Sequence, residues 1–166
     1  MKTLIRLLAV GGLLVVSACG DNTVDHDRRY LVEPRKSAAQ TQTAGLHPNE
    51  TPELRGLINK YAAEYQVPAE LIHRVVIRES RHRPGARNGP YYGLMQILPA
   101  TARGMGYRGA PSGLLDADTN LKYAVKYLRG AYLVADGNQD AAVSWYAKGY
   151  YYEAKRKGLL EEAGLR

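Results

Sequence analysis

The stretch PAELIHRVVIRES, residues 68–80, decides the fold. Its apolar residues recur at helical spacing, which predicts a helix that starts near Pro68 and buries one face. Glu79 follows Val75 by four residues and Leu71 by eight, so its side chain belongs to that buried face, near the C-terminal end of the helix. Burial and the negative end of the helix dipole both disfavour a charged carboxylate there. Both effects predict a raised pKa, as a general acid needs at neutral pH.

An ion pair is the structural alternative for Glu79. Arg78, Arg81 and Arg83 are the candidate partners, at the point where the helix frays. Charged helix ends are common, so the pair Glu79-Ser80 taken alone favours this alternative. The residues downstream of the pair reverse that preference.

The remainder of the chain from Thr51 onward is also predicted to be helical. Thr51 is a suitable N-cap with Pro52 at the first helical position, and apolar residues continue at helical spacing to Tyr65. Further helices are expected from Pro99 to Gly104, from Thr119 or Asn120 to near Gly137, from Asp140 to Ala147 and from Tyr151 to Leu160. The sequence shows neither sustained apolar alternation nor an internal repeat. The predicted class is therefore all-α, as one compact domain.

Three motifs follow one another from Glu79 onward: ESRHRPGA (79–86), GLMQI (93–97) and PATA (99–102). Their order and spacing closely resemble the soluble lytic transglycosylase family of peptidoglycan-cleaving enzymes. Asn120-Leu121 and Tyr127-Leu128 resemble the next motif of that family. The resemblance covers residues 51–149 and implies a lysozyme-like helical domain, related in fold to goose-type lysozyme.

The resemblance implies that Glu79 is the single catalytic acid/base. It also implies five substrate-binding residues, namely Ser80, Gly93, Met95, Gln96 and Tyr146. A glycine at position 93 lets the backbone approach a sugar closely, and a methionine offers an adaptable apolar surface. The side-chain amide of Gln96 can both donate and accept a hydrogen bond.

The sequence departs from the family pattern at two places that bear on the site. His82 stands where the family usually has an aromatic residue. The family's Ala-Tyr-Asn-Ala-Gly motif corresponds here to WYAKG (145–149), so that Tyr146 and Gly149 match while Ala147 replaces the asparagine. We expect Tyr146 to hydrogen-bond Glu79 or a sugar hydroxyl. The missing asparagine affects efficiency and substrate geometry more than reaction class.

The reaction implied by the resemblance is cleavage of the β-1,4 bond between N-acetylmuramic acid and N-acetylglucosamine without water, giving a 1,6-anhydromuramoyl end. Such a reaction needs one enzymic carboxylate, whereas glycoside hydrolysis normally uses two. Asp116 and Asp118 are the candidates for a second carboxylate, and Asp118 is equally suited to starting a helix. The lyase is therefore favoured over a lysozyme-type hydrolase that uses water. A non-catalytic glycan-binding accessory lipoprotein is the alternative from another functional class.

The N-terminus predicts export. An apolar stretch from Leu4 to Val16 follows Lys2, and the sequence Ser17-Ala18-Cys19 resembles the lipobox of bacterial lipoproteins. This pattern predicts a signal peptide over residues 1–18, lipidation of Cys19 and a polar, flexible tether over residues 19–50, ahead of a domain over residues 51–166. The alternative is an ordinary cleaved signal with an incidental cysteine. Gly20 after the cysteine favours the periplasmic face of the outer membrane over the inner membrane.

Charge and composition indicate the partners. The net charge is +7, or +5 once Lys2 and Arg6 leave with the signal. An exported basic protein meets anionic, peptide-bearing glycan strands and a membrane surface, but not nucleic acid. Tyr91, Tyr92, Tyr146 and Tyr150 to Tyr152 are candidates for lining a sugar groove. We expect a monomer without cofactor. We also expect no metal site, because His73 and His82 have neither zinc-ligand spacing nor a partner carboxylate in register.

Overall fold

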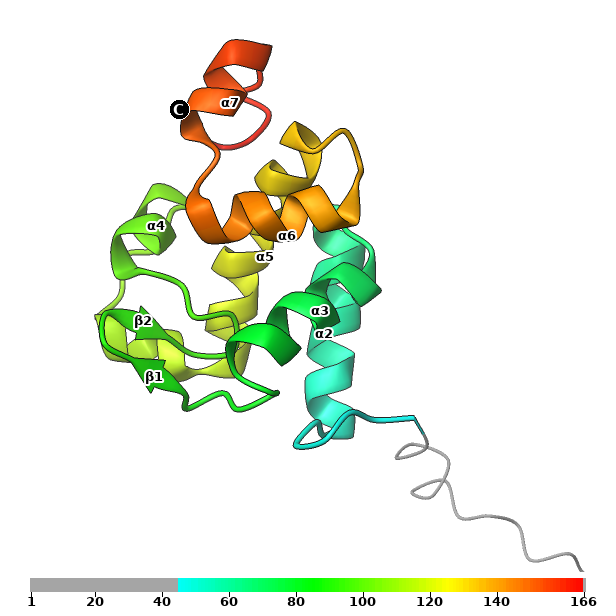
Figure 1. The fold of residues 1–166 in the computed structure, drawn as a ribbon. Coiled ribbons are helices and arrows are strands. Elements are labelled where there is room, and N and C mark those ends of the chain that lie inside the picture. Colours follow the sequence, from blue (N-terminus) through cyan, green and yellow to red (C-terminus); the bar gives the residue numbers. More distant parts are fainter. Residues whose placement is uncertain (1–44, 166) are drawn as a thin grey trace, which may run out of the picture. The chain divides into compact units, whose positions relative to one another are not determined.

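The computed structural model describes residues 45–165, which are mostly helical (Figure 1). The predicted all-α class is confirmed. In chain order the elements are α2 (Pro52–Tyr65), α3 (Ala69–Glu79), β1 (Arg87–Asn88), β2 (Tyr91–Tyr92), α4 (Pro99–Gly104), the 3-10 helix η1 (Pro111–Leu115), α5 (Ala117–Val134), α6 (Gln139–Lys148) and α7 (Tyr151–Lys157). The signal peptide, Cys19 and most of the tether lie outside the described residues. Within residues 45–165, every helix is too short or too polar to cross a membrane.

Local capping chemistry sets the helix boundaries. The Thr51 hydroxyl accepts a hydrogen bond from the Leu54 N–H at 3.2 Å, which starts α2 as predicted. Helix α5 begins at Ala117, two or three residues earlier than expected, because the Asp116 carboxylate accepts from the Thr119 N–H at 2.8 Å. Helix α7 ends at Lys157, short of the predicted Leu160.

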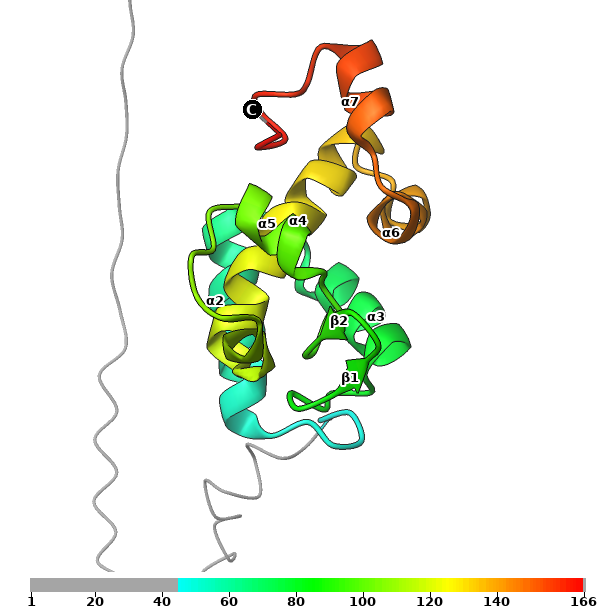
Figure 2. The ribbon, with the colours of Figure 1, turned by 90° about the vertical axis from the view of Figure 1, so that its left-hand side faces the viewer.

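Helix α5 is the centre of the hydrophobic core. It packs against α2 and α6 and also contacts η1, α4 and α7, and both views show it beside α2 (Figures 1 and 2). Leu121, Val125 and Leu128 on α5 are fully buried. Burial of each such side chain contributes about 1.5–3 kcal/mol. Because α3 packs against both α2 and α6, its position is set by the same core.

A short antiparallel hairpin joins α3 to α4, which the all-helical prediction missed. Arg87 pairs with Tyr92 and Asn88 with Tyr91, around a two-residue turn that starts at Gly89. Gly89 has a φ of 56°, a conformation that glycine adopts without strain. An isolated bridge between Tyr92 and Ile97 then closes the loop 93–96.

The side chain of Asn120, on α5, holds this loop in place by hydrogen bonds. Its side-chain oxygen accepts from the Met95 N–H at 3.0 Å, and its amide nitrogen donates to the carbonyls of Tyr92 and Leu114, both at 2.8 Å. The Asn120 side chain is buried and all of these polar groups are paired. The register of the loop 93–96 relative to α5 is therefore fixed by one side chain.

Candidate active site

Glu79 is the last residue of α3, and its side chain is 24 % exposed. Burial raises the pKa of its carboxyl group, while the positive charge of Arg78 works in the opposite direction. The Arg78 Nε atom lies 3.4 Å from the carboxylate, so the predicted ion pair and the predicted pKa rise are both present. The net effect is a raised pKa, which favours a protonated Glu79 at higher pH than for an ordinary glutamate.

Two adjoining hollows open beside Glu79, with volumes of about 620 and 440 Å³. Both are lined by Glu79, Asn88 and Gln96, so they meet at these three residues. Tyr127 and Tyr146 line the larger hollow. Among the residues of 45–165 that line the two hollows, Glu79 is the only aspartate or glutamate. We refer to the two hollows together as the groove.

Gln96 lies in the groove in a strained backbone conformation, with a φ of 48°. Its side-chain nitrogen donates to the carbonyls of Ala86 at 3.1 Å and Gly93 at 2.9 Å. Because both partners are acceptors, they fix which end of the amide is nitrogen. The side-chain oxygen remains to accept from a ligand hydroxyl, because the nitrogen already donates to these two backbone carbonyls.

Tyr146 closes the wall of the groove from α6. Its hydroxyl donates to the Met95 carbonyl at 2.9 Å. The sequence had instead predicted a hydrogen bond to Glu79 or to a sugar hydroxyl. Burial, followed by the negative charge of Glu79, raises the pKa of the Tyr146 phenol well above its usual range. Tyr146 therefore stays neutral and ties α6 to the loop 93–96.

Three of the predicted substrate-binding residues do not line the groove. Ser80 is buried and its hydroxyl donates to the Val76 carbonyl at 3.3 Å. The Met95 side chain is fully buried in the core. Gly93 faces Asn120, and a Cβ atom there would lie 2.3 Å from the Asn120 side-chain nitrogen. The structure thus places Glu79, Gln96 and Tyr146 together, and puts Ser80, Gly93 and Met95 behind them as support.

The two candidates for a second carboxylate lie elsewhere. Asp116 caps α5. Asp118 accepts from Lys60 and from the Tyr61 hydroxyl, both at 2.9 Å. Neither lines the groove.

Several groove residues were not predicted from the sequence to bind substrate. Asn88 and Thr101 line the groove as polar side chains, and Tyr127 lines it as an aromatic one. The Asn88-Gly89 dipeptide is a hairpin-turn signal that would have indicated the hairpin, although Asn88 itself lies in β1 and the turn is formed by the next two residues. Of the tyrosines proposed as groove residues, Tyr91 and Tyr146 line the groove; Tyr92, Tyr150, Tyr151 and Tyr152 do not.

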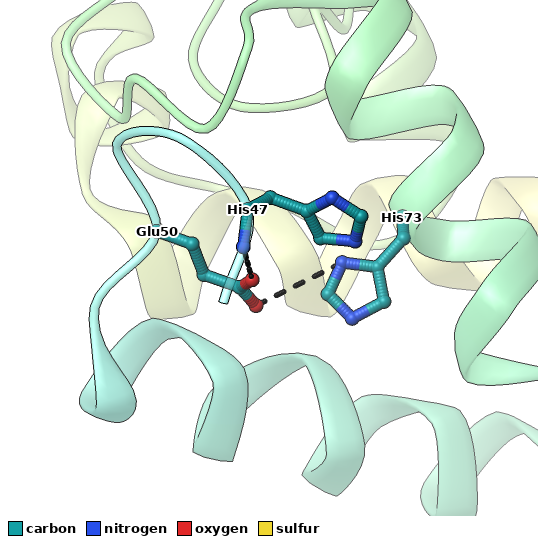
Figure 3. A group of neighbouring side chains, drawn as sticks. All are labelled: His47, Glu50 and His73. Atoms are coloured by element: carbon teal, nitrogen blue, oxygen red, sulfur yellow. Dashed lines mark hydrogen bonds and ion pairs between the residues drawn. The ribbon is translucent and has the colours of Figure 1, made fainter. Parts of the chain in front are cut away.

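A second polar cluster, which does not line the groove, lies between α3 and the segment that precedes α2 (Figure 3). The Glu50 carboxylate lies 3.8 Å from the Nδ1 atom of His73, so His73 does have a partner carboxylate, contrary to the sequence-based expectation. Glu50 is buried and accepts from Arg55 Nε at 2.6 Å. Glu50 therefore packs against α3.

Fold and site together define a class: a lysozyme-like, all-α domain with one carboxylate in an open polar groove. A family model described as the transglycosylase SLT domain matches residues 56–161, a span that includes Glu79, Gln96 and Tyr146. The chain belongs to this family, which confirms the resemblance seen in its motifs. Membership supports peptidoglycan lytic transglycosylase activity in general. No solved structure matches the chain.

Proposed function

We propose that this protein cleaves the β-1,4 bond between N-acetylmuramic acid and N-acetylglucosamine of peptidoglycan without water, with Glu79 as the single general acid/base. One observation carries the proposal. Among the described residues, Glu79 is the only carboxylate that lines the groove, burial raises its pKa, and neither Asp116 nor Asp118 reaches the groove. A hydrolase with two carboxylates would need a partner for Glu79 across the scissile bond.

The reaction needs two proton transfers at the same carboxyl group. Protonated Glu79 gives its proton to the bridging oxygen as the bond from the muramoyl anomeric carbon to that oxygen breaks. The resulting carboxylate then takes the proton of the muramoyl 6-hydroxyl, whose oxygen bonds to the same anomeric carbon. The ring closes as a 1,6-anhydro end, N-acetylglucosamine leaves with a free hydroxyl, and Glu79 is again protonated.

The charge of the groove suits an anionic glycan. Arg78 and Lys148 line the larger hollow, and Arg83 and Arg87 line the smaller one, against the single acid Glu79. The lactyl groups and stem peptides of peptidoglycan are anionic, so this excess of positive charge attracts the strand on both sides of Glu79. The exposed Tyr91 ring offers a surface on which a sugar face can stack.

An accessory protein that binds glycan without cleaving it is the second candidate. Ala147, which lines the groove, stands where the family motif has an asparagine. Purified sacculi separate the two functions. Both candidates sediment with sacculi, but only the enzyme releases soluble muropeptides. Sedimentation without any release would establish the binder and overturn the enzyme.

The alkaline limb of the pH profile reports on the Glu79 proton. Catalysis starts from protonated Glu79, so kcat/KM falls as the pH rises through the pKa of that group. Arg78 lowers this pKa, and Arg78→Gln therefore moves the falling limb to higher pH. The position of the limb, measured on isolated glycan strands, is the readout, because substrate binding by Arg78 changes only its height.

The control for that shift is Arg103→Gln, which removes an exposed arginine that does not line the groove. We expect its limb to coincide with that of the wild type. A limb that stays in place or moves to lower pH in Arg78→Gln would show that Glu79 is not the group that titrates.

We also propose that the protein is lipid-anchored through Cys19 on the periplasmic side of the cell envelope, at the outer membrane. The support is the sequence of the signal, ending in Ser17-Ala18-Cys19, with Gly20 next. Cys19→Ala is expected to abolish incorporation of labelled fatty acid and to move the protein from the membrane fraction to the soluble one. Labelling that persists in Cys19→Ala would contradict the anchor.

A further inference from the structure

Three of the four histidines in the sequence meet at one place. His47 lies on the segment before α2, His73 on α3, and His82 in the turn after α3. Glu50 joins them from the same segment as His47 (Figure 3). Three separate parts of the chain therefore bring imidazole and carboxylate groups together, and none of the four residues lines the groove.

The distances within this cluster are close to those of a metal coordination sphere. His73 Nδ1 lies 3.2 Å from His82 Nε2 and 3.8 Å from Glu50 Oε1. The ligand atoms of His47, Glu50 and His73 all lie within 4.8 Å of one another. Two nitrogens that bind one tetrahedral zinc ion at about 2.0–2.1 Å are roughly 3.3 Å apart. The His73–His82 pair is already at that spacing, where the two nitrogens can also share a hydrogen bond, and the ligand atoms of His47 and Glu50 would move closer on binding an ion.

The side chains of His73, His82 and Glu50 are buried, so the ligand atoms that they offer lie away from bulk water.

Hydrogen bonds orient the Glu50 carboxylate, as hydrogen bonds to the ligands of a metal site do. Arg55 donates to Oε1 at 2.6 Å and to Oε2 at 2.7 Å, and the His47 N–H donates to Oε2 at 2.9 Å. A carboxylate has about four acceptor positions, so one remains, on Oε1, the oxygen that lies 3.8 Å from His73. Such hydrogen bonds orient a ligand toward its ion.

We propose that His47, His73, His82 and Glu50 bind one divalent transition-metal ion of the zinc type. Imidazole nitrogen is a ligand for zinc, copper and nickel, whereas calcium and magnesium prefer sites made of oxygen. With four protein ligands the site is closed, so its role is structural rather than catalytic.

The ion would hold the turn that follows Glu79. Arg81 and His82 have φ values of 52° and 57°, a left-handed conformation that is costly for residues with a side chain. Asn49 already holds this turn, because its side-chain nitrogen donates to the Arg81 carbonyl at 3.0 Å. An ion bound between His82, His73 and the segment 47–50 cross-links the same elements a second time.

The test uses the purified full chain, freed of metal by a chelator and titrated with zinc chloride in a calorimeter. We expect one zinc ion per chain and a rise in Tm of about 5–10 °C at a hundred-fold excess of zinc over Kd. Magnesium chloride is expected to produce neither effect. No saturable zinc binding, or a magnesium response equal to that of zinc, would overturn the proposal.

Variants locate the ion. His47→Ala removes a ligand from a surface segment, and His73→Ala removes one from α3; each is expected to weaken zinc binding at least ten-fold. His26→Ala removes the fourth histidine, which lies outside the described residues, and is expected to bind zinc as the wild type does. If His73→Ala fails to fold, His47→Ala alone decides the question. Zinc binding unchanged in His47→Ala, or lost in His26→Ala, would assign the ion to another place.

Discussion

Glu79→Gln lowers the rate of muropeptide release from purified sacculi by roughly 10²–10⁴-fold. The amide has nearly the shape of the carboxyl group but can neither give up a proton to the leaving oxygen nor take one from the muramoyl 6-hydroxyl. No other aspartate or glutamate among residues 45–165 lines the groove to replace it. Chromatography of the released muropeptides over time gives the rate.

The matched control for this loss is Glu70→Gln on the same helix. Glu70 is exposed at the other end of α3 and does not line the groove. We expect Glu70→Gln to release muropeptides at the wild-type rate, and both variants to keep the wild-type circular dichroism spectrum. Activity of Glu79→Gln within a few-fold of the wild type would remove Glu79 from the mechanism.

Gly93→Ala is expected to lower the free energy of unfolding by about 3–4 kcal/mol. Gly93 has a φ of 73°, which an alanine adopts only at a cost of about 1–2 kcal/mol. The new Cβ atom would also lie 2.3 Å from both the Asn120 side-chain nitrogen and the Leu114 carbonyl oxygen. Relief of that overlap breaks the hydrogen bonds by which Asn120 holds Met95 of the loop 93–96 and the Leu114 carbonyl. Urea unfolding, followed by circular dichroism, measures the change.

Gly56→Ala is the control for Gly93→Ala. Gly56 lies exposed on α2, where an added Cβ would have no atom within 4 Å. Its replacement is expected to raise the free energy of unfolding by up to about 1 kcal/mol, because alanine is the better helix former. If Gly93→Ala were as stable as the wild type, the close packing of Asn120 against Gly93 would be contradicted.

Helical periodicity predicted the helices because their apolar stripes are long enough to show the helical repeat. The stripe of Leu71, Ile72, Val75 and Val76 is buried as expected, and it carries Glu79 at its margin. The β1–β2 hairpin was missed because strands of two residues are too short to show alternation. The early start of α5 was missed because Asp116, rather than a residue nearer Thr119, caps the helix.

The candidate site was predicted in outline, whereas its inner arrangement was not. A motif groups residues by position, and it does not distinguish a side chain that faces the groove from one that supports it. Gln96 faces the groove, while Met95 next to it is buried in the core and offers its backbone to Asn120 and Tyr146. The histidine cluster could not be predicted from local spacing, because α2 separates His47 from His73 in the sequence and only tertiary packing brings them together.

Digestion of sacculi in heavy-oxygen water tests the central claim, that Glu79 serves as acid and then as base while the muramoyl 6-hydroxyl, rather than water, attacks the anomeric carbon. We predict that the wild type releases anhydro-ended muropeptides that carry no heavy oxygen, and that Glu79→Gln releases none. Mass spectrometry reads both outcomes from the same digest. Reducing ends that contain heavy oxygen would show that water is the acceptor and would contradict the account.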